Sequence, residues 1–423
     1  MVSYTLEQNF YGVSSPRELV TRFGSPLYVY NEKIIRARCR DMKQLVSDPG
    51  FQVDYSCKAN SNLELLRIIH EEGIWADAMS PGEILLLETA GFAAAEIFFV
   101  PNNVAAAEME YALAREIGVS VDSLSQLAQY GRLNPGGAVA VRFNPGIGLG
   151  HHEKVKTAGS RAKFGVAAPL AAAVKAVAAE FKLRIIGINQ HLGSLFLEGT
   201  DFLEGARRLL EIAAHFEDLQ FIDFGGGMGI PYQKQAGQNR LDLAEFGARF
   251  DRLLQEWRPR FPKDLRFKIE PGRYIVAECG VLLGTVHAVK ESYGTTFVGT
   301  DLGFNVLSRP VMYNSHHDIE VYPERESGSR DGKTVTVVGN ICESGDILAQ
   351  ERRLPPMREG DLIGVMDAGA YGFAMASNYN NRLRPAEVLV RADGRVELIR
   401  RRESPEDLLR CFPSIVKHAP ASV

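Results

Sequence analysis

Residues suited to chemistry recur where short, apolar, β-rich segments of this sequence end. They are Lys58, Asp77, Arg142, His191 with Ser194, the glycine-rich run 225–229, and the turn Glu270-Pro271-Gly272-Arg273. Charged residues are seldom buried near a core without a partner or a task, so their presence at successive strand ends needs one common explanation. The C-terminal ends of parallel strands meet at one edge of a sheet or one mouth of a barrel, where active sites are built.

Each of these residues also has a purely structural interpretation. A lysine at a strand end is usually a charge at the rim, and an isolated His191 is more often a core histidine with satisfied hydrogen bonds. The glycine run departs from the spacing G-x-G-x-x-G because position 230 is Ile, so it is not a dinucleotide-binding fingerprint. It is either a tight turn or a row of backbone N–H groups for an anion such as phosphate. Glu270 and Arg273 alone could form a salt bridge within a turn.

Together, these residues match the needs of one phosphorylated cofactor. The glycine run, Ser194 and the Gly272-Arg273 backbone could hold a phosphate, and a flat ring could rest on His191. Lys58 could form an imine with an aldehyde. Glu270 could hold a protonated ring nitrogen through a charge-assisted hydrogen bond. Pyridoxal 5′-phosphate (PLP) needs all four of these groups.

Metal binding and disulfide bonds are not expected. The two residues of each pair, His151-His152 and His316-His317, would point to opposite faces of a strand, so neither pair is expected to form a metal site. The cysteines show no C-x-x-C spacing; they are Cys39, Cys57, Cys279, Cys342 and Cys411. An odd, scattered set is typical of a reducing compartment, so we expect a cytoplasmic protein.

Length and composition indicate a globular enzyme of more than one domain. The chain has 423 residues, of which 45% are hydrophobic and 24% charged, and its formal net charge is −4. No basic block is present, so neither nucleic acid nor an anionic membrane is an expected partner. The first residues, MVSYTLEQNFYG, do not resemble a signal peptide, and no run of about 18 uncharged apolar residues indicates a membrane span.

Strand-like and helix-like segments alternate through the first two thirds of the chain. We predict strands at 52–58, 74–80, 96–101, 118–123, 138–145, 184–194, 221–227 and 266–273. Amphipathic segments lie between them, and Gly73 and Gly91 stand where two of those helices should end. Eight alternations predict a TIM-type (β/α)8 barrel, with a doubly wound open sheet as the structural alternative.

After residue 275 the pattern changes to short β-branched runs separated by Gly and Asp turns. Examples are VLLGTVHAVKES, TTFVGTD, KTVTVVGN, DLIGVMD, AEVLVRADG and RVELIRR. These runs predict a C-terminal all-β domain, a sandwich or a barrel. We therefore expect a cofactor-binding barrel over residues 32–275 and a β domain over residues 276–423, with residues 1–31 packed on it and the β domain completing the active site.

At this point the sequence resembles the fold-type III, PLP-dependent amino-acid decarboxylases, the group that includes ornithine, diaminopimelate and arginine decarboxylases. The resemblance covers nearly the whole chain and is carried by motifs in the family's order. They are YSCKANSN, VRFNP, KFGV, HLGS, DFGGGMGIPY, EPGRYIVAECG, SRPVMYNSHHDIE, CESGD and DAGAYGFAMASNYNNRLRPAEVLV.

The resemblance assigns the cofactor-binding roles. Lys58 would carry PLP as a Schiff base, and His191 would stack on the ring with Asp77 nearby. Glu270 would pair with the pyridinium nitrogen. The remaining cofactor-binding positions are Arg142, Ser194, Gly226, Gly227, Gly272, Arg273 and Tyr371.

The resemblance also assigns the substrate-binding roles and the assembly. Substrate would meet Arg273, Arg309, Tyr313, Glu343 and Tyr371. Cys342 would be the proton donor to Cα, so the catalytic set is Lys58, Cys342, His191 and Glu270. The family's subunits pack head to tail, and the segment CESGD with Cys342 and Glu343 would reach into the partner's site in a homodimer.

The implied reaction is decarboxylation of meso-2,6-diaminopimelate to L-lysine and CO2, the last step of lysine synthesis. The glutamate at position 270 favours decarboxylation, because alanine racemase, which has a similar barrel, carries arginine there. The alternatives are another substrate, such as ornithine, lysine, carboxynorspermidine or a siderophore precursor, or a catalytically silent PLP-binding homologue. The sequence departs from the family around NQHLGSLF (189–196) and in the segment 148–165.

Overall fold

The alternating segments in the first two thirds of the chain form a closed parallel barrel. In barrel order its strands are β2 (Phe51–Ser56), β3 (Trp75–Ala78), β4 (Ile97–Phe99), β5 (Gly118–Val121), β6 (Ala138–Asn144), β9 (Arg184–Asn189), β11 (Phe221–Asp223) and β12 (Arg266–Ile269). Parallel pairing of β12 with β2 closes the ring. The barrel prediction is confirmed, and the alternative of an open sheet is wrong.

The computed structural model describes residues 3–150, 157–159, 162–324 and 332–413. They fall into two compact units. The barrel unit takes the described residues of Ile35–Pro231 and Asn239–Val276. The second unit takes those of Met1–Ile34, Tyr232–Gln238 and Ala277–Val423.

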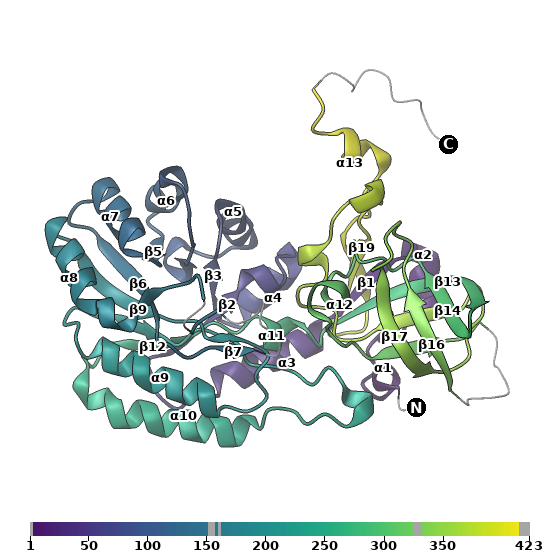
Figure 1. Ribbon diagram of the computed structural model, residues 1–423, viewed down its shortest axis with the longest axis horizontal. Coiled ribbons are helices and arrows are strands. Elements are labelled where there is room, and N and C mark those ends of the chain that lie inside the picture. The colour runs from purple at the N-terminus through teal and green to yellow at the C-terminus, as the bar shows by residue number, and fades with distance from the viewer. Residues whose placement is uncertain (1–2, 151–156, 160–161, 325–331, 414–423) are drawn as a thin grey trace. The chain divides into compact units, whose positions relative to one another are not determined.

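Helices cover the outside of the barrel strands (Figure 1). They are α3 (Glu32–Lys43), α4 (Leu63–Glu71), α5 (Pro81–Ala90), α6 (Ala106–Leu113), α7 (Leu124–Leu133), α8 (Ala171–Glu180), α9 (Thr200–Ala213), α10 (Leu243–Trp257) and the short α11 (Arg273–Val276). A side chain caps the start of some of these helices: Ser80 Oγ accepts a hydrogen bond from the Glu83 N–H at the start of α5. Gly91 ends α5 in a left-handed conformation, as its position predicts. In the part of the chain described, no helix is long and apolar enough to cross a membrane.

The barrel strands end earlier than the sequence pattern indicates. Strand β2 stops at Ser56, two residues before Lys58, and β9 stops at Asn189, two residues before His191. After β11 the chain turns at Gly225, whose φ of 71° lies in the left-handed region. Lys58, His191 and Glu270 therefore lie on turns after the strands, whereas Asp77 and Arg142 lie on β3 and β6 themselves. Two short parallel strand pairings follow the barrel strands. One joins β7 (Leu149–Gly150) to β10 (Gly193–Ser194), and the other joins β6 to β8 (Val166–Ala167).

The second unit is built on a mixed sheet. Its strands are β1 (Leu27–Asn31), β13 (Gly280–Ser292), β14 (Thr295–Thr300), β15 (Ile319–Tyr322), β16 (Lys333–Val338), β17 (Ile347–Leu354), β18 (Leu362–Val365), β19 (Ala386–Val390) and β20 (Val396–Arg400). The short helices of this unit are α1 (Tyr4–Glu7), α2 (Pro16–Phe23), α12 (Arg309–Tyr313) and α13 (Pro405–Leu409). The C-terminal β unit is thus present, as predicted.

The N-terminal strand β1 lies inside this sheet. It pairs antiparallel with β13 and parallel with β19. All five of its residues are buried, and Leu27 and Val29 belong to the hydrophobic core of the unit. The beginning and the end of the chain are therefore joined in one sheet.

Candidate active site

Lys58 lies in a single 3-10 turn, Cys57–Ala59, directly after β2. The turn is held by its neighbours. The Tyr55 hydroxyl donates to the Asn60 carbonyl at 2.9 Å, and Asn60 Oδ1 accepts from the Asn62 N–H at 3.0 Å. The half-buried Lys58 amine is thus carried on a defined turn at the C-terminal end of a barrel strand, where active sites of this architecture lie.

Three carboxyl groups are buried around the same end of the barrel: Asp77 on β3, Asp223 on β11 and Glu270 directly after β12. The Ser56 hydroxyl links two of these segments, since it lies 2.7 Å from Asp77 Oδ2 and 3.2 Å from the Glu270 carbonyl. No N–H or O–H donor of the described residues reaches Asp77 Oδ1, Asp223 Oδ2 or Glu270 Oε1. Buried oxygens without a donor are costly, which marks this cluster as a site for a ligand.

Burial dominates the titration of this cluster. It raises the pKa of Asp77 to about 7 and of Asp223 to about 6, and it raises the pKa of Glu270 well above its usual value. The other carboxylates raise the pKa of Glu270 further, while the charge of Lys58 lowers it. Asp223 lies close to Glu270, and after burial its charge contributes most to the raised pKa of Glu270.

His191 is half-buried beside two cations and is held by the glycine run. Burial, with the charges of Lys58 and Arg142, lowers its pKa well below the usual value. The Gly226 N–H donates to His191 Nδ1 at 3.2 Å, so the neutral ring carries its proton on Nε2. Burial also lowers the pKa of Arg142, against the opposing charges of Glu270 and other carboxylates, and its guanidinium lies 4.8 Å from the centroid of the Phe164 ring.

Two glycines allow close backbone approach at this site. A Cβ on Gly226 would lie 2.0 Å from the Glu270 carbonyl oxygen, and one on Gly272 would lie 2.9 Å from Ser56 Cβ. Beside them, Arg273 donates to Ser194 Oγ from Nη2 at 2.9 Å and from Nε at 3.3 Å. The glycines, a hydroxyl and a guanidinium thus line one wall, which suits an anion.

Comparison with known proteins decides the family. The family model described as pyridoxal-dependent decarboxylase, pyridoxal binding domain, matches residues 32–277. Diaminopimelate decarboxylase of Methanothermobacter thermautotrophicus is 42% identical, with 93% of this chain and 92% of that protein covered. That of Archaeoglobus fulgidus is 37% identical, with 93% and 94% covered. The crystal structure of diaminopimelate decarboxylase from Helicobacter pylori complexed with L-lysine superposes with a TM-score of 0.84 at 30% identity, covering 94% of this chain and 98% of that one.

The chain belongs to the pyridoxal-dependent decarboxylases. The family confirms the expected enzyme class and its cofactor, PLP. The described residues fit this cofactor: Glu270 Oε1 lacks a donor, which a protonated ring nitrogen would supply. Lys58 provides the amine, and the wall of Gly226, Gly272 and Arg273 suits the phosphate.

The predicted site residues of this decarboxylase divide between the two units. The barrel unit brings together Lys58, Asp77, Arg142, His191, Ser194, Gly226, Gly227, Glu270, Gly272 and Arg273. The second unit carries Arg309, Tyr313, Cys342, Glu343 and Tyr371. Cys342 and Glu343 are exposed in the loop between β16 and β17, and the Cys342 N–H donates to Asn380 Oδ1 at 2.8 Å.

Arg309 is the most enclosed of the second group, with 1% of its surface exposed. Its Nη1 lies 2.7 Å from His317 Nε2, and His317 Nδ1 lies 2.7 Å from the Met366 carbonyl. Because a carbonyl only accepts, Nδ1 carries the proton and Nε2 accepts from Arg309. The guanidinium also lies 4.4 Å from the centroid of the Tyr232 ring. The arginine is therefore fixed in one orientation.

The sequence interpretation overlooked several residues that support the site. Asp223, Ser56, His317 and Tyr232 were not predicted as site residues. Asp223 is the first residue of the motif DFGGG. The alternation of side chains along its strand directs it into the barrel, and this alternation could have identified it as a site residue. Of the histidine pairs considered for metal binding, His151-His152 lies outside the described residues. His316 pairs with Asp318, and the described residues contain no group of three potential metal ligands.

Proposed function

We propose that this protein decarboxylates meso-2,6-diaminopimelate to L-lysine and CO2, the last step of lysine synthesis. The observation that carries this proposal is the similarity to proteins named diaminopimelate decarboxylase over 93% of the chain at 42% identity. The cysteines of the chain carry free thiols, which supports action in a reducing compartment such as the cytoplasm.

The barrel residues would hold the cofactor and set its charge. When bound, PLP supplies an electron sink for the charge left at Cα as CO2 departs. Lys58 would hold the cofactor through its amine, and Glu270 would keep the ring nitrogen protonated. The neutral His191 ring, fixed by Gly226, would lie against the cofactor ring, with Asp77 and Arg142 beside it. Ser194, Gly227, Gly272 and Arg273 would bind the phosphate.

The residues of the second unit would read the distal end of the substrate. Arg309, together with Arg273, would bind the distal carboxylate, and Glu343 would pair with the distal ammonium. Tyr313 and Tyr371 would complete the pocket. A site with both signs of charge rejects amino acids that lack either group, because its buried partners would be left unpaired. The fixed orientation of Arg309 supports this role, since carboxylate recognition depends on the planar guanidinium fork.

The functional form would be a homodimer with two shared sites. The β unit would complete the active site, with Cys342 and Glu343 contributed across the interface. Both residues are exposed in the single chain, which supports this assignment. Cys342 would deliver the proton to Cα once CO2 has left.

The test is purified protein with PLP and a panel of amino acids. We expect meso-diaminopimelate to be turned over faster than ornithine, lysine or carboxynorspermidine, and faster turnover of any of these would overturn the substrate. Lys58→Ala should lose both the cofactor absorption band near the visible edge and the activity. A Lys58→Ala variant with full turnover would refute the assigned role.

A further inference from the structure

The barrel interior contains a buried ion pair one layer below the cofactor residues. Lys268 Nζ donates to Asp54 Oδ2 at 2.8 Å, and the two residues are 6% and 0% exposed. Lys268 stands two residues before Glu270, and Asp54 stands two residues before Ser56. Because side chains alternate along a strand, Lys268 points to the same side as Glu270, and Asp54 points to the same side as Ser56, into the barrel interior. The cofactor function assigned above does not use this pair.

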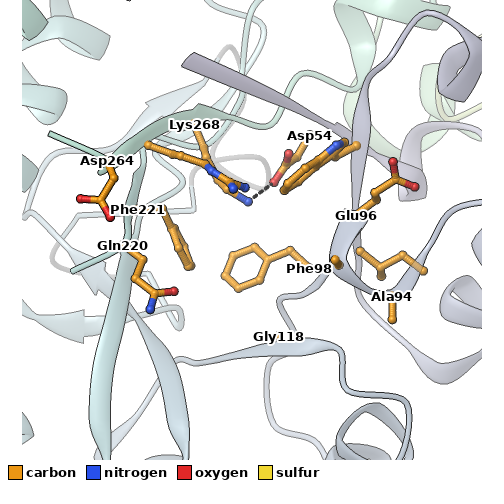
Figure 2. Close-up of a pocket in the computed structure, with 13 residues that line it drawn as sticks. Asp54, Ala94, Glu96, Phe98, Gly118, Gln220, Phe221, Asp264 and Lys268 are labelled. Atoms are coloured by element: carbon orange, nitrogen blue, oxygen red, sulfur yellow. Dashed lines mark hydrogen bonds and ion pairs between the residues drawn. The ribbon is translucent and has the colours of Figure 1, made fainter. Parts of the chain in front are cut away.

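The pair is reached from the opposite end of the barrel. A pocket of about 350 Å³ has Asp54, Lys268 and the N-terminal residues of several barrel strands in its wall (Figure 2). Inside it, the Lys268 ammonium lies 4.8 Å from the centroid of the Phe221 ring, 5.3 Å from that of Trp75 and 5.4 Å from that of Phe98. These ring faces stabilise the cation in place. Asp54 Oδ1 has no donor among the described residues.

The pair is coupled to the carboxyl groups above it. Asp223 and Lys268 are register partners on the adjacent strands β11 and β12. After burial, the charge of Asp54 raises the pKa of Asp223 and the charge of Lys268 lowers it. The charge of Asp223 in turn raises the pKa of Glu270. A chain of direct electrostatic contacts therefore runs from the pocket to the residue assigned to the cofactor ring nitrogen.

We propose that the Asp54–Lys268 ion pair is a positioning element that sets how the Asp223–Glu270 pair shares its protons, and so the pH range in which the site accepts its cofactor. The proposal rests on the proposed function, because Glu270 is taken as the cofactor's partner. Asp54 restrains Lys268, and a Lys268 freed from Asp54 acts more strongly on Asp223.

Other charges face the same carboxyl pair and must remain constant in any test. Lys58, Asp77 and Arg142 interact with the pair directly. Glu83, Asp122 and His191 interact with one or more of those three groups. None of them is altered by changes at positions 54 and 268. PLP has titrations of its own, but these are common to all variants, so a difference between variants reports the protein.

The experiment is PLP binding to cofactor-free protein, followed by absorbance as a function of pH. Asp54→Asn keeps the shape and an oxygen acceptor for Lys268 and removes only the charge. Cofactor affinity should fall at low pH, as the carboxyl groups become protonated. We expect the pH at which it falls to be lower by about 1 unit in Asp54→Asn, because the unrestrained cation favours ionised Asp223. The double variant D54N/K268M should lose this shift, and D54N/K268R, which keeps a cation, should retain it.

The variants separate this link from a merely structural role. Loss of packing would weaken binding at every pH and would not depend on the charge at position 268. The proposal would be overturned if PLP affinity fell at the same pH in Asp54→Asn as in the unaltered protein, or if D54N/K268M showed the same shift as Asp54→Asn. If Asn at position 54 prevents folding, Asp54→Ser provides another neutral acceptor. The same measurement, the pH at which PLP affinity falls, then tests the proposal. Failure of the unaltered protein to bind PLP at all would instead refute the proposed function, and this inference with it.

Discussion

The Gly226 N–H donates a hydrogen bond to Nδ1 of His191 at 3.2 Å. A ring nitrogen that accepts cannot also carry a proton, so His191 is locked as the Nε2–H tautomer. Burial, Lys58 and Arg142 lower its pKa well below the usual value, which keeps the ring neutral. The glycine run thus presents a flat, uncharged ring to the site.

We expect His191 to stay neutral throughout the range in which histidines usually titrate, around pH 6.5. The reason is that protonation would place a hydrogen on Nδ1, against the Gly226 N–H, in a half-buried site beside the charges of Lys58 and Arg142. Nitrogen NMR of labelled imidazole rings between about pH 5.5 and 8 would show the Nε2–H tautomer unchanged. The exposed His215 provides an internal reference for the spectra. Titration of His191 within this range would contradict the assignment.

The stability of the cofactor-free protein should fall as pH rises from about 4 to about 7. The folded-state pKa of Asp77, about 7, and of Asp223, about 6, lie above the unfolded values near 3.9, so the folded state binds more protons in this window. Such stabilisation is complete below the unfolded pKa and is lost as pH rises through the folded pKa. Each group contributes a slope of about 1.4 kcal/mol per pH unit inside its window.

Asp77→Asn should flatten this dependence, because the amide does not titrate. Chemical denaturation at a series of pH values measures the slope. Asp218→Asn, at an exposed position, provides the matched control and should leave the slope as it is. A slope in Asp77→Asn equal to that of the unaltered protein would show that Asp77 is not among the groups that hold protons in the fold.

The shared-site dimer predicts that two inactive variants restore activity to each other. Lys58→Ala removes the barrel amine, and Cys342→Ala removes the proton donor assigned to the partner's site. After mixing and reassociation of equal amounts, half of the dimers are mixed and each has one intact site of two. About one quarter of the unaltered activity should therefore return.

The control for this experiment combines two defects in the same unit. Lys58 and Glu270 both belong to the barrel, so a mixed dimer of Lys58→Ala and Glu270→Gln contains no intact site. This mixture should stay near the activity of its parents. Equal recovery in both mixtures, or none in either, would speak against sites shared between subunits.

Local patterns predicted the barrel well but not the long-range pairing of the second unit. Alternation of β-rich and amphipathic segments locates all eight barrel strands, because each strand–helix unit is local in sequence. Strand β1 was not predicted as part of the sheet, since its partners β13 and β19 lie about 250 and 360 residues away along the chain. The strands β15 and β17 were also missed.

For the site as well, the sequence motifs predicted the main residues but not the contacts that packing forms between them. Lys58, His191 and Glu270 stand out because their side chains are unusual at strand ends. The supporting contacts of Ser56 with Asp77, and of His317 with Arg309, join segments that no local spacing relates. The protonation of Asp223 depends on burial and on charges from two other strands, which only the closed barrel brings together.

Replacement of Arg309 should weaken substrate recognition while leaving the cofactor in place. Arg309 is buried, donates to His317 at 2.7 Å and stacks on Tyr232, so its fork is presented in one fixed orientation. Lysine keeps the charge but loses the planar fork, and a lost charged hydrogen bond costs about 1.5–3 kcal/mol, or roughly 10- to 150-fold. We therefore expect Arg309→Lys to raise KM for meso-diaminopimelate by about that factor, with PLP absorbance unchanged. Arg395→Lys, at an exposed position, is the matched control. An unaltered KM in Arg309→Lys would remove Arg309 from the substrate site, whereas loss of the cofactor band would assign it to the cofactor instead.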